Sequence, residues 1–142
     1  MTEGDRAEIA CLTLEDYYRA AAEALGTDLA TVRAVTNDTL AGSALAAPSA
    51  GFGDFDKYPE FATKTAVLLQ AVASNHALPD GNKRTALLCA ILFAALNGYR
   101  WVPPEGDDPD GTETAEMVEA TSMRTVPLED LASWIEDRLQ AI

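Results

Sequence analysis

Five chemically active side chains lie within nine positions, from His76 to Arg84. The stretch reads HALPDGNKR and supplies an imidazole, a carboxylate, a carboxamide, an ammonium and a guanidinium group. It comes just before a long apolar run, Ala86 to Leu96, so we expect these residues to lie where a helix begins. The first turn of a helix presents unpaired backbone amides and the positive end of the helix dipole.

Lys83 and Arg84 lie at the helix end where positive charge is unfavourable. Each cation costs a few tenths to about 1 kcal/mol there unless negative charge lies beside it, so local stability does not explain the pair. A polyphosphate is the simplest compensation, because Gly81 allows close backbone approach and the amides around Asn82 can hold phosphate oxygens. The alternative is a solvated pair of surface charges.

Asp80 and His76 add the remaining groups of a phosphate-transfer site. A carboxylate beside bound phosphates is a natural ligand for Mg²⁺, which takes oxygen donors and shares its shell with phosphate. Asp80 could instead cap the helix. His76 is the only histidine in the chain, and imidazole side chains suit proton abstraction from a hydroxyl. The alternative for His76 is a structural cap or a surface position.

The elements that must position these residues are mostly helices. Capping residues and apolar periodicity predict seven of them, at Thr13–Gly26, about Asp28–Val35, Thr36–Pro48, Pro59–Ser74, about Gly81–Asn97, Thr112–Ser122 and Pro127–Gln140. The helix at 81–97 is apolar on all sides from Ala86 onward, which predicts a central buried helix. Ser49–Pro59 mixes aromatic residues with glycine and aspartate, which favours a short exposed hairpin. The predicted fold class is all-α, a bundle around one buried helix, with a β-hairpin flap.

Length and composition indicate a single domain over residues 1–142. The chain is 48% hydrophobic and 23% charged, as is usual for a globular domain. A net charge of −13 argues against direct nucleic-acid binding, which depends on basic residues. The apolar run at 86–96 is too short to cross a bilayer, residues 1–8 lack the features of a secretion signal, and two cysteines do not suggest a disulfide framework. We therefore expect a cytoplasmic protein without a membrane partner.

The stretch from His76 to Arg84 resembles the signature of the Fic/Doc family, and is closest to its Doc (death-on-curing) toxins. The resemblance extends over about residues 36–101, from LAGSALAAP through the flap to LNGYRW. Leu78 replaces the usual phenylalanine, an aromatic core anchor, and we expect leucine to keep that position buried. Lys83 stands where AMP-transferring members have glycine, and Leu87 where they have a second arginine. Both differences match Doc.

The resemblance implies a Mg-ATP-dependent kinase that transfers the γ-phosphate to a serine or threonine hydroxyl of a translation factor, with elongation factor Tu as the known target. His76 would be the base and Asp80 the Mg²⁺ ligand. Phosphates would be bound by Asn82, Lys83, Arg84 and the Gly81 amide. The target would be positioned as an added strand by the flap residues Phe52, Gly53, Asp54 and Phe55.

Two other functions stay open for the same residues. One is protein AMP transfer, in which the nucleotide rather than the γ-phosphate reaches the target hydroxyl. The other is a catalytically silent fold that only binds a nucleotide or a protein partner. The chain lacks the Ser/Thr-x-x-x-Glu-Gly/Asn pattern with which Fic enzymes restrain themselves. The resemblance therefore implies restraint in trans by a Phd-like antitoxin.

Overall fold

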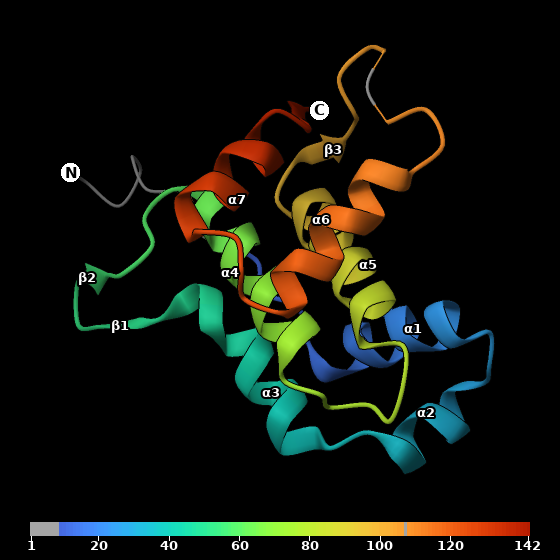
Figure 1. The fold of residues 1–142 in the computed structure, drawn as a ribbon. Helices are drawn as coiled ribbons and strands as arrows, with labels where there is room; N and C mark the ends of the chain where they lie inside the picture. Colours follow the sequence, from blue (N-terminus) through green and yellow to red (C-terminus); the bar gives the residue numbers. More distant parts are fainter. Residues whose placement is uncertain (1–8, 107) are drawn as a thin grey trace.

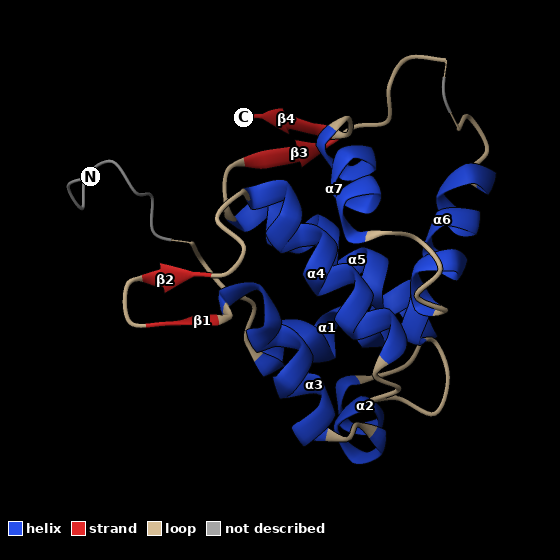
Figure 2. Cartoon of the chain, turned by 60° about the vertical axis from the view of Figure 1, so that its left-hand side comes forward, coloured by secondary structure: helices blue, strands red, loops and turns tan. Residues whose placement is uncertain are grey.

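The structure, a computed structural model that describes residues 9–106 and 108–142, is a helical bundle with two small antiparallel hairpins (Figure 1). Its helices are α1 (Leu14–Leu25), α2 (Leu29–Val35), α3 (Asp38–Ala46), α4 (Phe61–Ser74), α5 (Asn82–Leu96), α6 (Thr112–Ser122) and α7 (Leu128–Glu136). The strands are β1 (Gly51–Phe52), β2 (Phe55–Asp56), β3 (Tyr99–Trp101) and β4 (Leu139–Ala141), and a 3₁₀ turn (Ala47–Ser49) follows α3. The predicted helical class with a hairpin flap is confirmed (Figure 2). Residues 1–8, which entered the expectation of a cytoplasmic protein, lie outside the described residues.

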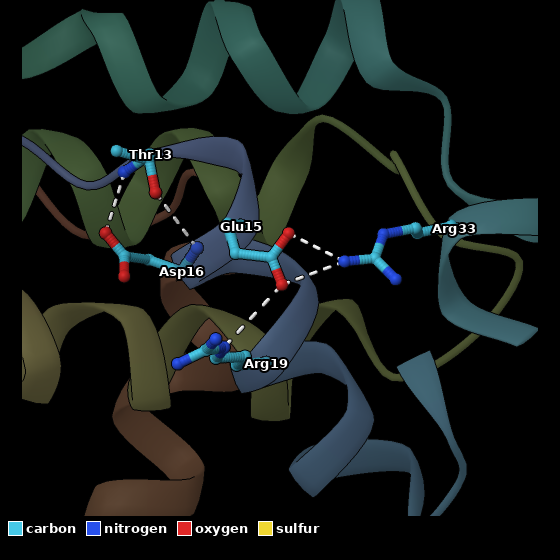
Figure 3. Close-up of polar contacts among 5 residues, drawn as sticks. All are labelled: Thr13, Glu15, Asp16, Arg19 and Arg33. Atoms are coloured by element: carbon cyan, nitrogen blue, oxygen red, sulfur yellow. Dashed lines mark hydrogen bonds and ion pairs between the residues drawn. The ribbon is translucent and has the colours of Figure 1, made fainter. Parts of the chain in front are cut away.

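Helix α1 begins at a capping box and is joined to α2 by an ion pair (Figure 3). The amide of Asp16 donates to Thr13 Oγ1 over 3.1 Å, and the amide of Thr13 donates to Asp16 Oδ2 over 2.9 Å. Arg33 Nη2 lies 2.7 and 2.9 Å from the two carboxylate oxygens of Glu15, and Arg19 Nε lies 3.6 Å from Glu15 Oε2. The hydrogen bond from Arg33 is the main reason that the pKa of Glu15 is lowered. These contacts hold α2 beside α1.

Helices α4 and α5 together form the centre of the bundle, so the prediction of α5 as its single central helix is confirmed only in part. Helix α5 packs against α4, α1, α6 and β3, whereas α4 packs against α3, α5, α6 and α7 and has no exposed residue (Figures 1 and 2). Seven side chains of α5 are buried: Asn82, Thr85, Ala86, Cys89, Ala90, Phe93 and Ala94. Leu96, in its last turn, is 47% exposed, so the helix is not covered on every side. Burial raises the pKa of the free Cys89 thiol to about 12, and within the described ranges no helix is long and apolar enough to cross a membrane.

The sequence predicts that the last helix ends at Gln140, and this prediction is wrong. Helix α7 ends at Glu136, and residues 139–141 form β4, which pairs with β3 in the register Tyr99↔Ala141 and Trp101↔Leu139. Arg138 lies at the break between them, is 1% exposed, and stacks its guanidinium 3.8 Å above the Trp134 ring. A three-residue strand is too short for its alternation to be recognised in the sequence.

The acidic residues of 105–111 predict a loop of solvated surface charges, and this prediction is wrong for Asp108, which is bonded to the start of α6. Asp108 accepts hydrogen bonds from the amides of Glu113 and Thr114, both over 2.8 Å, and also from the Thr114 hydroxyl. The Thr114 hydroxyl bond is the largest of the effects that lower the pKa of Asp108. The carboxylate thus ties the segment to the first turn of α6.

Candidate active site

The loop between α4 and α5, residues 75–81, carries His76 and Asp80 and is fastened to the start of α3. The amide of Asn37 donates to the Ala77 carbonyl over 2.8 Å, and Asn75 Nδ2 donates to the Leu40 carbonyl over 3.4 Å. Figure 1 shows the loop running past α2 and α3 before it enters α5. The loop is therefore supported by a helix that the sequence places some forty residues earlier.

His76 is the most unusual residue of this loop. Its φ is +55°, a left-handed conformation that costs a non-glycine residue free energy, and its side chain is exposed. Among the described residues, the imidazole has no hydrogen-bond or ion-pair partner, so it does not act as a helix cap. Its neighbour Ala77 is 5% exposed and hydrogen-bonded to α3, which holds the strained backbone in place. The imidazole is thus available to a ligand.

Helix α5 begins without a side-chain cap. Its N-cap is Gly81, with φ +81°, so the alternative that Asp80 caps the helix is wrong. No acceptor among the described residues takes a hydrogen bond from the amides of residues 81–84, whereas the Thr85 amide donates to the Gly81 carbonyl over 2.9 Å. The φ of Gly81 favours glycine, and a Cβ there would also lie 2.6 Å from Leu25 Cδ2, so that the Leu25 side chain would have to shift. Four unpaired amides at a positive helix end favour an anion.

The two cations of the motif have protein partners on opposite flanks of α5. Lys83 Nζ lies 2.5 Å from Glu119 Oε1 on α6, and Arg84 Nη1 donates to the Ala24 carbonyl in the last turn of α1 over 3.0 Å. The protein itself therefore offsets these charges in part, which neither the polyphosphate nor the solvated pair predicted from the sequence had included. Lys83 and Glu119 are both about half exposed, so their ion pair is weak and the ammonium can exchange it for another anion.

Asn82 is directed into the loop. It is 9% exposed, and both ends of its carboxamide bond to the backbone of Leu78. Leu78 itself is 3% exposed, which confirms that leucine keeps this position buried. Asp80 is exposed and has no ion-pair partner in the described part of the chain, and no group of three or more metal-binding side chains is present there. A magnesium ion at Asp80 would therefore need phosphate and water oxygens to complete its shell.

The predicted flap exists, but the structure does not bring it to the loop. Strands β1 and β2 form a hairpin whose tip exposes Phe52 by 80% and Phe55 by 56%, with ring centroids 5.5 Å apart. The base of the hairpin is bonded to Lys64 in the first turn of α4, whereas His76 follows its last turn. A helix of 14 residues is about 20 Å long, and both views show flap and loop at opposite ends of α4 (Figures 1 and 2).

Three contacts of the site were not foreseen from the sequence. Glu119 on α6 pairs with Lys83, and the Ala24 carbonyl on α1 accepts a hydrogen bond from Arg84. The amide of Asn37, the N-cap of α3, donates to the Ala77 carbonyl of the loop. No local spacing joins these residues to the motif, since they lie 36, 60 and 40 positions away from their partners. A sequence pattern has no signal for such pairs, because their proximity follows from the packing of whole helices.

Comparison with known proteins gives one family and one curated relative. Residues 8–94 match the Fic/DOC family. A relative from Mycolicibacterium smegmatis (strain ATCC 700084 / mc(2)155), named Toxin Doc, is 34% identical over 122 residues, which cover 86% of this chain and 88% of the relative. No solved structure gives a significant match.

Proposed function

The chain belongs to the Fic/DOC family, and from this premise we propose that it is a Doc-like toxin that phosphorylates a protein. The reaction is transfer of the γ-phosphate of ATP to a serine or threonine hydroxyl of a translation factor similar to elongation factor Tu. One observation carries the proposal: four unpaired amides at the start of α5 lie next to a loop whose only imidazole is exposed and without a partner.

The phosphate groups are bound at the start of α5. The amides of residues 81–84 supply donors, Lys83 exchanges its weak bond to Glu119 for phosphate oxygen, and the Arg84 guanidinium keeps further donors beyond the one bonded to Ala24. Asp80 would hold Mg²⁺, with phosphate and water oxygens completing the shell. When bound, the metal would neutralise phosphate charge and make the phosphorus easier to attack.

His76 receives the proton of the target hydroxyl. The hydroxyl oxygen forms a bond to the γ-phosphorus, an unprotonated ring nitrogen of His76 takes up the hydroxyl proton, and the bond from the γ-phosphorus to the β–γ bridging oxygen breaks, so that ADP leaves. The exposure of the side chain gives a protein substrate access to it, and the anchored backbone of residues 77 and 78 limits its movement. General-base catalysis of this kind typically contributes about 10²–10⁴-fold to the rate.

Leu87 favours phosphoryl transfer over AMP transfer. The AMP-transferring pattern has a second arginine at this position, whereas Leu87 is half-buried and packs against the hydrophobic core. The site therefore has one guanidinium fewer with which to grip a second set of phosphate oxygens. Lys83 in place of glycine adds an ammonium in the first turn of α5, where the transferred γ-phosphate would lie.

The partners follow from the same premise. The M. smegmatis relative is named a toxin, and we extend that role to this chain, with a Phd-like antitoxin restraining it in trans. If the flap adds a strand from the target, that strand lies about 20 Å from His76 along α4, which an extended chain spans in about six residues. The flap then selects a target segment at some distance from the hydroxyl that is modified.

Label transfer tests the proposal directly. The purified protein is incubated with a cell lysate and Mg-ATP labelled at either the γ or the α phosphorus. Label from the γ position alone, on an acceptor the size of a translation factor, is the expected result. Transfer of the α label would identify AMP transfer instead, and transfer of neither label would contradict an enzymatic role.

His76→Ala tests whether toxicity depends on the chemistry. We expect expression of the unaltered protein to arrest growth and expression of His76→Ala at equal level to leave growth normal. Mg-ATP affinity should stay within about twofold, because the residue's role is proton abstraction. Growth arrest that persists in the variant would show that the fold acts by binding alone.

A further inference from the structure

Both polar atoms of the Asn82 carboxamide are hydrogen-bonded to one backbone residue, Leu78. Its Oδ1 accepts a hydrogen bond from the Leu78 amide over 3.1 Å, and its Nδ2 donates to the Leu78 carbonyl over 2.9 Å. Asn82 is the first residue of α5, so these two bonds close residues 78–82 into a ring against the helix. Asn82 is 9% and Leu78 3% exposed, so the bonds are shielded from water.

The same arrangement occurs at the other end of α5. Asn97 Oδ1 accepts from the Ala10 amide over 2.8 Å, and Asn97 Nδ2 donates to the Ala10 carbonyl over 2.9 Å. Each end of α5 thus carries an asparagine that binds both backbone groups of one residue in another segment. At residue 97, remote from the motif, the ring ties a chain segment to the helix.

Turning the Asn82 carboxamide towards a phosphate would break this ring. Leu78 would lose the acceptor of its amide and the donor to its carbonyl, and two buried backbone groups without partners are costly. The ring leaves one N–H of Nδ2 unused, and only that donor could be offered to a ligand while the ring stays closed. The free amides of residues 81–84 offer phosphate oxygens donors without any such loss.

We infer that Asn82 is a positioning residue, whose side chain serves the site by holding the motif loop against α5. The ring fixes Leu78, and the bond from Asn37 fixes Ala77, so the loop is anchored at two consecutive residues directly after His76. Asp80 and Gly81 are part of the ring, which therefore holds them next to the first turn of α5. This role in catalysis rests on the proposed function, whereas the ring itself does not.

Hydrogen exchange in the nucleotide-free protein tests the ring without any activity. In Asn82→Ala we expect the Leu78 amide, followed by NMR, to exchange about 3- to 10-fold faster, because it loses its acceptor. The Thr85 amide, bonded to Gly81, serves as an internal reference. Asn97→Ala is the matched control: it should free the Ala10 amide and leave Leu78 unchanged. An unchanged Leu78 rate in Asn82→Ala would overturn the inference.

Kinetics then separate positioning from phosphate binding. We expect Asn82→Ala to lower kcat for phosphoryl transfer at least about tenfold, because the base is displaced, with KM for ATP within about twofold. Asn97→Ala should leave both constants unchanged. A raised KM with unchanged kcat would identify a phosphate ligand and overturn the inference. Absence of transfer by the unaltered protein would contradict the proposed kinase activity. The exchange rate of the Leu78 amide would still show whether the Asn82 side chain holds the loop.

The unaltered protein provides a measurement that does not depend on the folding of a variant. On saturation with Mg-ATP, the Leu78 amide should stay at least as protected as in the free protein. Faster exchange of this amide in the presence of Mg-ATP would mean that the carboxamide leaves the loop for the nucleotide, and would overturn the inference.

Discussion

Arg84 serves two helices at once. Its backbone lies in the first turn of α5, where a cation is unfavourable, but its guanidinium reaches the Ala24 carbonyl in the last turn of α1. The last carbonyls of a helix form its negative pole and are stabilised by a cation. The side chain therefore stabilises one helix end more than it disturbs the other, which is why a purely local treatment of its charge fails.

This residue gives a prediction opposite in sign to the one from α5 alone. Removing a cation from the start of α5 should stabilise that helix, but in Arg84→Met we expect the free energy of unfolding to fall by about 1 kcal/mol as the bond to Ala24 is lost. The Tm should fall by about 4 °C, measured by thermal unfolding without nucleotide. Arg100→Met is the control, because Arg100 is exposed on β3 and has no side-chain partner in the described part of the chain. A Tm at or above that of the unaltered protein would contradict the prediction.

At the scale of elements, α6 influences the site through one carboxylate. Glu119 pairs with Lys83, so it competes with phosphate for the ammonium. In Glu119→Gln we expect Mg-ATP to bind up to about fivefold tighter by calorimetry at low salt, since an exposed ion pair is worth at most about 1 kcal/mol.

Glu116→Gln is the matched control for this prediction. It removes the same charge from the same helix at an exposed position that has no ion-pair partner among the described residues. An equal gain in affinity in both variants would mean that the overall negative charge, rather than the Lys83 contact, is responsible.

The flap depends on a buried cation in α4. Lys64 Nζ lies 2.9 and 2.8 Å from the carboxylate oxygens of Asp56 and 3.2 Å from the Pro48 carbonyl, and its side chain is 6% exposed. In Lys64→Met we expect the free energy of unfolding to fall by about 3 kcal/mol, because a largely buried carboxylate loses its counter-ion. Urea denaturation measures this loss.

Hydrogen exchange shows whether the loss reaches the hairpin. The Lys57 amide donates to the Ala50 carbonyl at the base of the flap and should exchange faster in Lys64→Met. Lys57→Met is the control, because the Lys57 side chain is exposed and only lies above the Tyr58 ring. Stability unchanged in both variants would show that the Lys64 ion pair does not hold the flap.

At the scale of the whole molecule, the net charge of −13 makes stability sensitive to acid. Moderate acidification reduces the repulsion between carboxylates. Among the described residues, the pKa values of four carboxyl groups are lowered by folding, chiefly because each accepts a hydrogen bond: Glu15 from Arg33, Asp28 from Thr31, Asp108 from Thr114 and Asp110 from Thr112. A group whose pKa is lower in the folded state contributes stability above its unfolded value and loses it as the pH falls through the folded one.

We therefore expect the Tm to rise from pH 7 towards about pH 5 and to fall steeply below about pH 4. Thermal unfolding, followed by circular dichroism at a series of pH values, measures both the rise and the fall of the Tm. In Asp108→Asn the fall at low pH should be shallower, because one of the four groups no longer titrates. A Tm that continues to rise below about pH 4 would show that charge repulsion outweighs the folded-state hydrogen bonds.

The existence of the seven helices, the burial of α5 and the family signature could all be predicted from the amino-acid sequence. Thr13, Gly26 and Asp28 mark helix ends through bonds to residues within a few positions, and the apolar run of α5 predicts its burial whatever packs around it. Such features are local, and the free energy that produces them comes from neighbouring residues along the chain. The HALPDGNKR stretch is local in the same sense.

The contacts of the motif side chains could not be predicted from the sequence and are known from the folded structure alone. In the fold, Arg84 bonds to a carbonyl of α1 and Lys83 pairs with a carboxylate of α6. His76 lies at the end of α4 opposite the flap, and β4 pairs with β3. These contacts join residues 36 and 60 positions apart, or elements at opposite ends of a helix. They follow from how whole helices pack, since packing energy is spread over many side chains and no single stretch of sequence records it.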